Sequence, residues 1–87
     1  MSNEDKVVES FDLSKITKTS KFPLICIYNN PKDYPGKYVA RLWDTNIPTH
    51  TIAIADNLEE IRETKPAEMV IMGRQPQDDP IIVETWI

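Results

Sequence analysis

Alternating apolar residues in the middle of the chain predict two neighbouring β-strands. In residues 37–44 and 50–56, successive side chains divide between two faces with a period of two, which is typical of strands half buried in a sheet. The first run places Tyr38, Ala40 and Leu42 on one face and Val39, Arg41 and Trp43 on the other. Residues 44–49 contain turn formers and a proline, so we expect a polar loop there.

A short helix is predicted directly after the second of these strands. Asp56 is placed to accept hydrogen bonds from the first turn, and Glu59, three residues later, completes a capping box. Leu58 and Ile61 lie three residues apart and form a narrow apolar stripe. Pro66 ends the helix, because a proline disfavours helical geometry at the preceding residue. A helix over residues 57–64 is too short to be stable alone, so it must pack on the sheet.

Strands are also expected at both ends of the predicted domain. Residues 22–28 have apolar side chains on both faces, which indicates a central or covered strand, and residues 81–87 form a strand by composition. Residues 69–72 are an apolar run, either a short strand or a packed extended segment, followed by a loop over 73–80. The expected fold class is α+β: an antiparallel β-meander with one helix packed on one face, in the order β-β-β-α-(β)-β.

Residues 1–20 are predicted to be a mostly flexible N-terminal segment, ahead of a single α+β domain over residues 21–87. The segment is polar and has no sustained hydrophobic period, although we expect partial docking between Phe11 and Ile16. A chain of 87 residues is long enough for one small domain. It contains no apolar run long enough to span a membrane, and residues 1–10 lack the apolar centre of a signal peptide. A cytoplasmic location is therefore expected.

Charge is unevenly distributed along the chain, whose net charge is −4. Residues 13–41 carry six basic residues and one acidic residue, whereas residues 42–87 carry three basic and nine acidic residues. The basic stretch also contains three tyrosines, and basic grooves with aromatic side chains bind single-stranded nucleic acids. The acidic balance of the whole chain, with a pI near 4.8, makes nucleic acid an unlikely partner. Solvated charged faces are the alternative interpretation.

No catalytic, metal or cofactor site is predicted. Cys26 lies in an apolar run and is interpreted as a small core residue. His50 is the single histidine, and one histidine with one cysteine does not make a zinc site. Asp78 and Asp79 supply too few oxygen ligands for a hard cation. The chain has no phosphate-binding glycine loop and no recognisable nucleophile motif, so we expect a protein that is not an enzyme.

The central region resembles the start of HicB-type antitoxin domains. The residues concerned are a strand, a loop containing Tyr34-Pro35-Gly36, two further strands and the helix start at 56–61. In that family a strand also continues into a helix of the form Asp-x-Leu-Glu-Glu. The resemblance covers residues 22–65 and implies an antitoxin-like regulatory role. This chain departs from the family pattern after residue 65, where no second helix and no DNA-binding segment is visible. The chain also resembles small bacterial and phage proteins in general.

The two tryptophans are the main candidates for a binding role. Trp43 and Trp86 each alternate with aliphatic residues in their strands, so each lies either on an uncovered sheet face or in a small core. Tryptophan, tyrosine and arginine are common anchors of protein interfaces. We therefore select Tyr38, Arg41, Trp43 and Trp86 as a possible interaction surface. The function expected is a non-enzymatic module that binds an unknown protein partner or forms a homodimer; the alternative is a weak nucleic-acid-binding or antitoxin-like regulatory protein.

Overall fold

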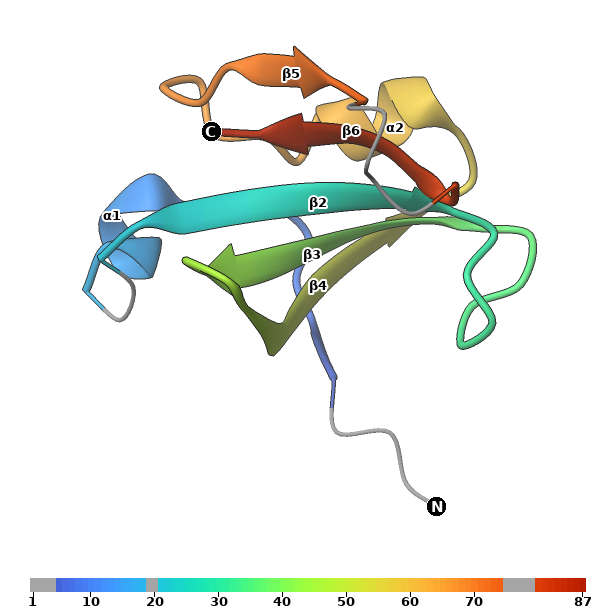
Figure 1. Ribbon diagram of the computed structural model, residues 1–87, viewed down its shortest axis with the longest axis horizontal. Coiled ribbons are helices and arrows are strands. Elements are labelled where there is room, and N and C mark those ends of the chain that lie inside the picture. Colours follow the sequence, from blue (N-terminus) through green and yellow to red (C-terminus); the bar gives the residue numbers. More distant parts are fainter. Residues whose placement is uncertain (1–4, 19–20, 75–79) are drawn as a thin grey trace.

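One mixed β-sheet organises the protein. The computed structural model describes residues 5–18, 21–74 and 80–87. Its elements are β1 (Lys6–Val7), α1 (Leu13–Ile16), β2 (Pro23–Asn29), β3 (Tyr38–Asp44), β4 (Ile47–Ala55), α2 (Leu58–Arg62), β5 (Ile71–Gly73) and β6 (Ile82–Trp86). The strand order in the sheet is β1-β4-β3-β2-β6-β5 (Figure 1). β1 runs parallel to β4, and the other neighbouring pairs are antiparallel.

The expected α+β class is confirmed, and the order of elements differs in detail. β2, β3 and β4 form the predicted antiparallel meander, and α2 follows it. The structure adds β1 and α1 ahead of the meander, so the described residues contain two short helices where one was expected. The C-terminal strand β6 lies between β2 and β5, next to the first strand of the meander. After β4 the chain passes over one side of the sheet through α2. It then returns to the sheet, where β6 pairs with β2.

The connection between β3 and β4 is shorter than predicted. Asp44 pairs directly with Ile47, which leaves a two-residue turn with Thr45 at a positive φ of 59°. Pro48 therefore lies inside β4, opposite Trp43. A proline is tolerated there because β1 pairs with β4 only at Thr51 and its neighbour, so the outer edge of β4 needs no donor at Pro48.

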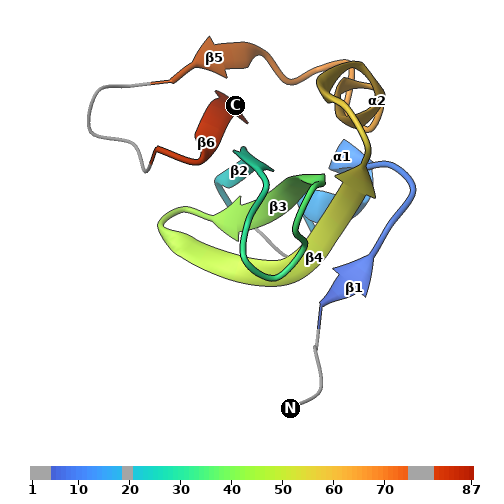
Figure 2. The ribbon, with the colours of Figure 1, turned by 90° about the vertical axis from the view of Figure 1, so that its right-hand side faces the viewer.

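The main core lies between one face of the sheet and the two helices. Both helices are on the same side of the sheet (Figure 2). The buried cluster consists of Phe11, Ile16, Ile25, Ile27, Ala40, Leu42, Ala53, Ile61, Met69 and Trp86. Ala40 and Ala53 are register partners on adjacent strands, and α2 contacts both of these strands. Their small side chains leave the space that Ile61 of α2 fills.

The start of α2 is one residue later than predicted. Asn57, not Asp56, is the N-cap: its Oδ1 accepts a hydrogen bond from the Glu60 amide at 2.9 Å, and its backbone is extended. Asp56 instead forms an exposed ion pair with Lys37. The sequence offers two adjacent capping residues, and the ion pair to β3 occupies the first of them.

A buried carboxylate joins α2 to β6. Glu84 is 3% exposed and accepts hydrogen bonds from Arg62 Nε at 3.1 Å and Arg62 Nη2 at 2.6 Å. The indole Nε1 of Trp86 donates to the same carboxylate at 2.8 Å. Burial alone would raise the pKa of Glu84, but the hydrogen bonds from Arg62 and Trp86 hold it below its usual value. The pair fixes the helix against the sheet without leaving an unpartnered charge.

Part of the N-terminal segment packs on the sheet. The Val8 amide donates to the Ile52 carbonyl at 2.8 Å, and Phe11 and Ile16, in the region where docking is expected, are both buried. The predicted flexibility of residues 1–4 and 19–20 lies outside the described residues. So do most of the 73–80 loop and the Asp78–Asp79 pair. The two described helices have four and five residues, too few to cross a bilayer.

Candidate functional site

The face of the sheet opposite the helices also consists largely of apolar side chains, which are buried or half-buried. We call it the open face. The strand registers place these side chains on it: Leu24, Cys26, Tyr28, Val39, Arg41, Trp43, Ile52 and Ile54. An antiparallel sheet that packs helices on one face usually presents alternating polar residues on the other. Here both faces of the three meander strands are largely apolar, and Arg41 is the charged residue among those named.

Arg41 is held by a carboxylate from the N-terminal segment. Its Nη1 and Nη2 donate to Asp5 Oδ1 and Oδ2, each at 2.9 Å, and Nη1 also donates to the Thr49 carbonyl at 2.6 Å. The Tyr34 hydroxyl donates to Asp5 Oδ2 at 3.1 Å, and His50 Nδ1 lies 3.2 Å from Oδ1. Asp5 thus links three segments of the chain over the open face.

This network neutralises the charge of the open face. The hydrogen bonds from Arg41 lower the pKa of Asp5 to about 2 against the opposing effect of burial, with smaller contributions from His50 and Tyr34. The same contact raises the pKa of Arg41. In this bidentate pair, the two terminal nitrogens of the planar guanidinium each donate to one oxygen of the carboxylate. Arg41 therefore acts as a fixed structural ion, and the surface beside it is available for apolar contacts.

Trp43 lies beside Arg41 and borders a hollow. Its indole Nε1 donates to the Tyr28 hydroxyl at 3.1 Å across the β2–β3 pair. Burial raises the pKa of Tyr28, with the nearby Cys26 adding to the shift, so the phenol stays neutral. The hollow has a volume of about 550 Å³, and Trp43 and Tyr28 line it together with Tyr34, Pro48 and other residues of β2, β3 and the 30–37 loop. Rigid aromatic walls of this kind suit an apolar side chain of a partner.

The structure divides the four predicted interaction residues between the two faces. Arg41 and Trp43 lie together on the open face, where both are partly exposed. Trp86 is fully buried on the helix face, so of the two predicted alternatives it lies in the core. Tyr38 is on the helix face as well, and packs against the core cluster. The four residues predicted from the sequence therefore do not share one face, and Arg41 and Trp43 are the two that lie together on the open face.

Three further residues, which the sequence analysis did not select, complete the site: Asp5, Tyr28 and Tyr34. Asp5 is in a polar segment that gave no structural signal, and its partner Arg41 is 36 residues away. Tyr28 is visible in the sequence as a strand residue in register with Val39, but the indole hydrogen bond depends on strand pairing. Tyr34 comes from a predicted turn cluster. The density of aromatic and proline residues around residue 34 is the signal that was available.

The histidine and the cysteine of the described residues each contact another side chain. His50 is exposed and faces Asp5, while the Thr85 hydroxyl lies 3.8 Å from the Cys26 sulfur. Within the described ranges, no group of three or more histidine, cysteine or acidic side chains is arranged to hold a metal ion.

Comparison with known proteins gives no match to a family model, to a curated protein or to a solved structure. The resemblance to HicB-type domains stays a prediction.

Proposed function

We propose that this protein is a non-enzymatic binding module that captures a protein partner on its open face, with a second copy of the chain as the first partner to test. The observation that supports the proposal is the Trp43–Tyr28 pair beside a hollow of about 550 Å³ on an apolar, charge-neutralised sheet face. A hollow bordered by aromatic side chains suits an apolar side chain of a protein partner. Trp43 is the expected anchor.

Self-association is tested by the solution mass, measured by light scattering over a hundredfold range of concentration. Trp43→Ser removes the anchor, and Ile47→Ser is the matched control. Ile47 is 65% exposed, and its pairing with Asp44 places it outside the open face. We expect the wild-type mass to rise toward that of a dimer and the Trp43 variant to remain monomeric, with the control unchanged. Circular dichroism must show that both variants are folded.

Capture of a different protein is tested with the same two variants as baits. A partner retained by the wild type and by Ile47→Ser, and lost with Trp43→Ser, supports the proposal. The proposal fails if the wild type is monomeric at every concentration and no partner distinguishes the Trp43 variant from its control.

The nucleic-acid alternative gains no support from the positions of the basic residues. Lys15 belongs to α1 on the helix side of the sheet, whereas Arg41 lies on the open face and is paired with Asp5. The basic stretch of the sequence therefore does not form one continuous positive surface. A salt-sensitive titration with oligonucleotides is the direct measurement, since phosphate contacts weaken as salt rises.

A further inference from the structure

The open face continues beyond the meander onto the two C-terminal strands. Met72 of β5 pairs with Thr85 of β6, and Thr85 pairs with Cys26, so all three side chains lie on the open face. The Val70 amide donates to the Ile87 carbonyl at 2.6 Å, and the Ile87 amide donates to the Val70 carbonyl at 2.9 Å. Because side chains alternate along a strand, this second pair lies on the same face, two residues further along each strand.

These two strands supply exposed aliphatic side chains to the open face. Val70 is 61% exposed, Ile87 49% and Met72 41%. Within the meander strands, by contrast, the large apolar side chains of this face are buried or half-buried, Trp43 among them. The open face therefore consists of one half with projecting aliphatic side chains and another half that is closely packed and hollowed beside Trp43.

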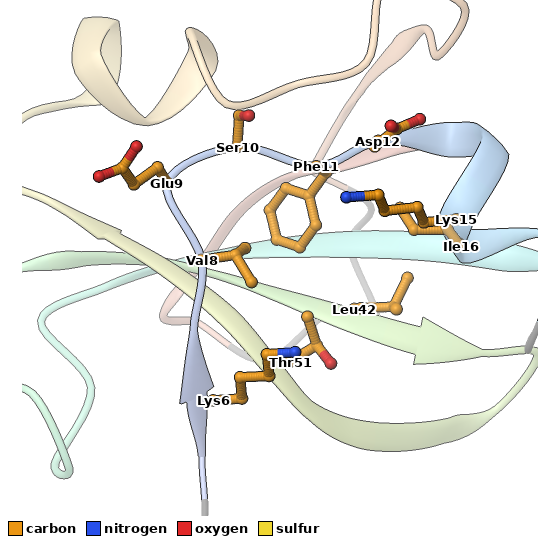
Figure 3. A pocket seen from close by; sticks show the side chains of 10 residues that line it. All are labelled: Lys6, Val8, Glu9, Ser10, Phe11, Asp12, Lys15, Ile16, Leu42 and Thr51. Carbon is orange, nitrogen blue, oxygen red and sulfur yellow. The ribbon is translucent and has the colours of Figure 1, made fainter.

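A hollow beside α1, on the helix side of the sheet, has a different character (Figure 3). Its apolar side chains Phe11, Ile16 and Leu42 are only 6%, 6% and 5% exposed. Lysines and carboxylates share the rest of its lining, so neither sign of charge is in excess there. Accessible aliphatic side chains and an aromatic hollow thus occur together on the open face.

The strand β2 separates the two halves of the open face. It is the middle strand of the series β4-β3-β2-β6-β5 (Figure 1). Trp43 lies on one side of Leu24, as its register partner on β3. Ile87 lies on the other side of Leu24, because Trp86 pairs with Ile25, the next residue of β2. A row of apolar side chains therefore crosses the face, with the indole and the exposed aliphatic groups on opposite sides of β2.

We infer that the hollow beside Trp43 receives the exposed aliphatic side chains of β5 and β6 from a second copy of this chain. The inference rests on the proposed function and names the partner surface that fills the site. With the open faces in contact and a two-fold axis along β2, the β6–β5 half of each copy covers the β3–β4 half of the other. Ile87 then lies opposite Trp43, and Val70 lies opposite Pro48, which also borders the hollow. Because the contact is isologous, both hollows are filled at once.

The size of the open face supports a second copy as the occupant. Five strands from β4 to β5 span about 19 Å, and the seven residues of β2 extend about 23 Å along them. This is about 440 Å² in projection, and the accessible surface of the side chains is larger. A standard interface takes about 800 Å² of accessible surface from each partner. The three meander strands are only about 10 Å across, so a stable dimer on this face has to include β6 and β5.

Two variants of β5 test the inference by light scattering. Val70→Lys places an ammonium group in the contact, and Ile71→Lys is the matched control. Ile71 pairs with Trp86, so the control adds the same charge to the same strand on the helix face. We expect the wild type to dimerise and Val70→Lys to raise the dissociation constant at least about tenfold, since burial of an unpaired ammonium group is costly. Ile71→Lys should leave the dissociation constant unchanged.

A second measurement does not depend on variants. In a mixture of isotope-labelled and unlabelled wild type, NMR should show contacts between the Trp43 indole of one copy and the methyl groups of Val70 and Ile87 of the other. These contacts decide the matter if Val70→Lys does not fold.

The inference and the proposed function fail in different ways. A dimer that is lost with Trp43→Ser but retained with Val70→Lys overturns the inference and leaves the proposed function standing. Equal weakening by Val70→Lys and Ile71→Lys, or absence of the contacts between copies, also overturns the inference. A wild type that is monomeric at every concentration overturns it as well, and the proposed function then depends on capture of a different protein.

Discussion

Replacing Arg62 with methionine tests whether the α2–β6 contact stabilises the fold. Methionine keeps an unbranched side chain over the sheet but removes both hydrogen bonds to Glu84. The buried carboxylate then retains the single bond from Trp86. A buried acceptor that loses its partners bears a desolvation cost that the wild type avoids.

The expected loss follows from the geometry. Hydrogen bonds to charged groups contribute roughly 1.5–3 kcal/mol each. The Arg62 side chain is 43% exposed, so water replaces part of what is lost. We expect the free energy of unfolding to fall by about 2 kcal/mol in total, which lowers the melting temperature by roughly 8–16 °C in a domain of this size. Urea unfolding monitored by tryptophan fluorescence and circular dichroism measures it, and the slope with urea should not change.

The pH dependence of the stability difference between wild type and variant tests the same contact independently. In the wild type the pKa of Glu84 is below its ordinary 4.5. Its contribution to stability is therefore complete above about pH 4.5 and is lost as the pH falls through the lower folded value. Without Arg62, burial raises the pKa of Glu84, so the variant regains stability as the pH falls. The difference between wild type and variant should shrink from pH 7 to pH 4.

Lys37→Met, which breaks an exposed ion pair with Asp56, is the control and should change stability far less. A loss below about 0.5 kcal/mol for Arg62→Met, within the range of ordinary surface substitutions, would contradict the reasoning. So would a difference that stays constant between pH 4 and pH 7.

Two further substitutions test other contacts. Asn57→Ala removes the N-cap of α2 and should cost about 1 kcal/mol in urea unfolding, whereas Asp56→Ala should have little effect; equal losses would mean that the cap is assigned incorrectly. Asp5→Asn should lower stability at pH 7, and the gap to the wild type should close between pH 4 and pH 2, because the pKa of Asp5 is lowered from 3.8 to about 2 and its contribution is lost as the pH falls through that interval. Thermal unfolding at several pH values measures this, and a gap that persists at pH 2 would refute it.

Local pattern was sufficient to find the meander strands and the following helix. The period of two in residues 37–44 and 50–56 predicted β3 and β4, because each alternate side chain has a different neighbour in a sheet. Capping chemistry located the start of α2 to within one residue. The turn between β3 and β4 is shorter than the sequence predicts, because Pro48 lies at an edge position of β4, where a strand tolerates a proline.

Contacts between distant segments had no local signal. Asp5 binds Arg41 across 36 residues, and Lys6 pairs with Thr51 in a parallel ladder. The short runs around them are polar or aperiodic, so propensity and period give no reason to place them on a sheet. The candidate site on the open face depends on this segment. That is why the sequence supplied Arg41 and Trp43 without the residues that complete their surroundings.

The choice of face for the helices depends on side-chain volume more than on hydrophobicity. Both faces of β3 and β4 are apolar, so the alternation alone cannot say which is covered. Ala40 and Ala53 are opposite each other on one face and leave room for Ile61, whereas Ile52 and its neighbours fill the other. Helices of four and five residues cover one face at most. The larger apolar side chains therefore lie on the open face, where Val39 and Ile52 are buried and the half-buried Trp43 is the residue that a partner can contact.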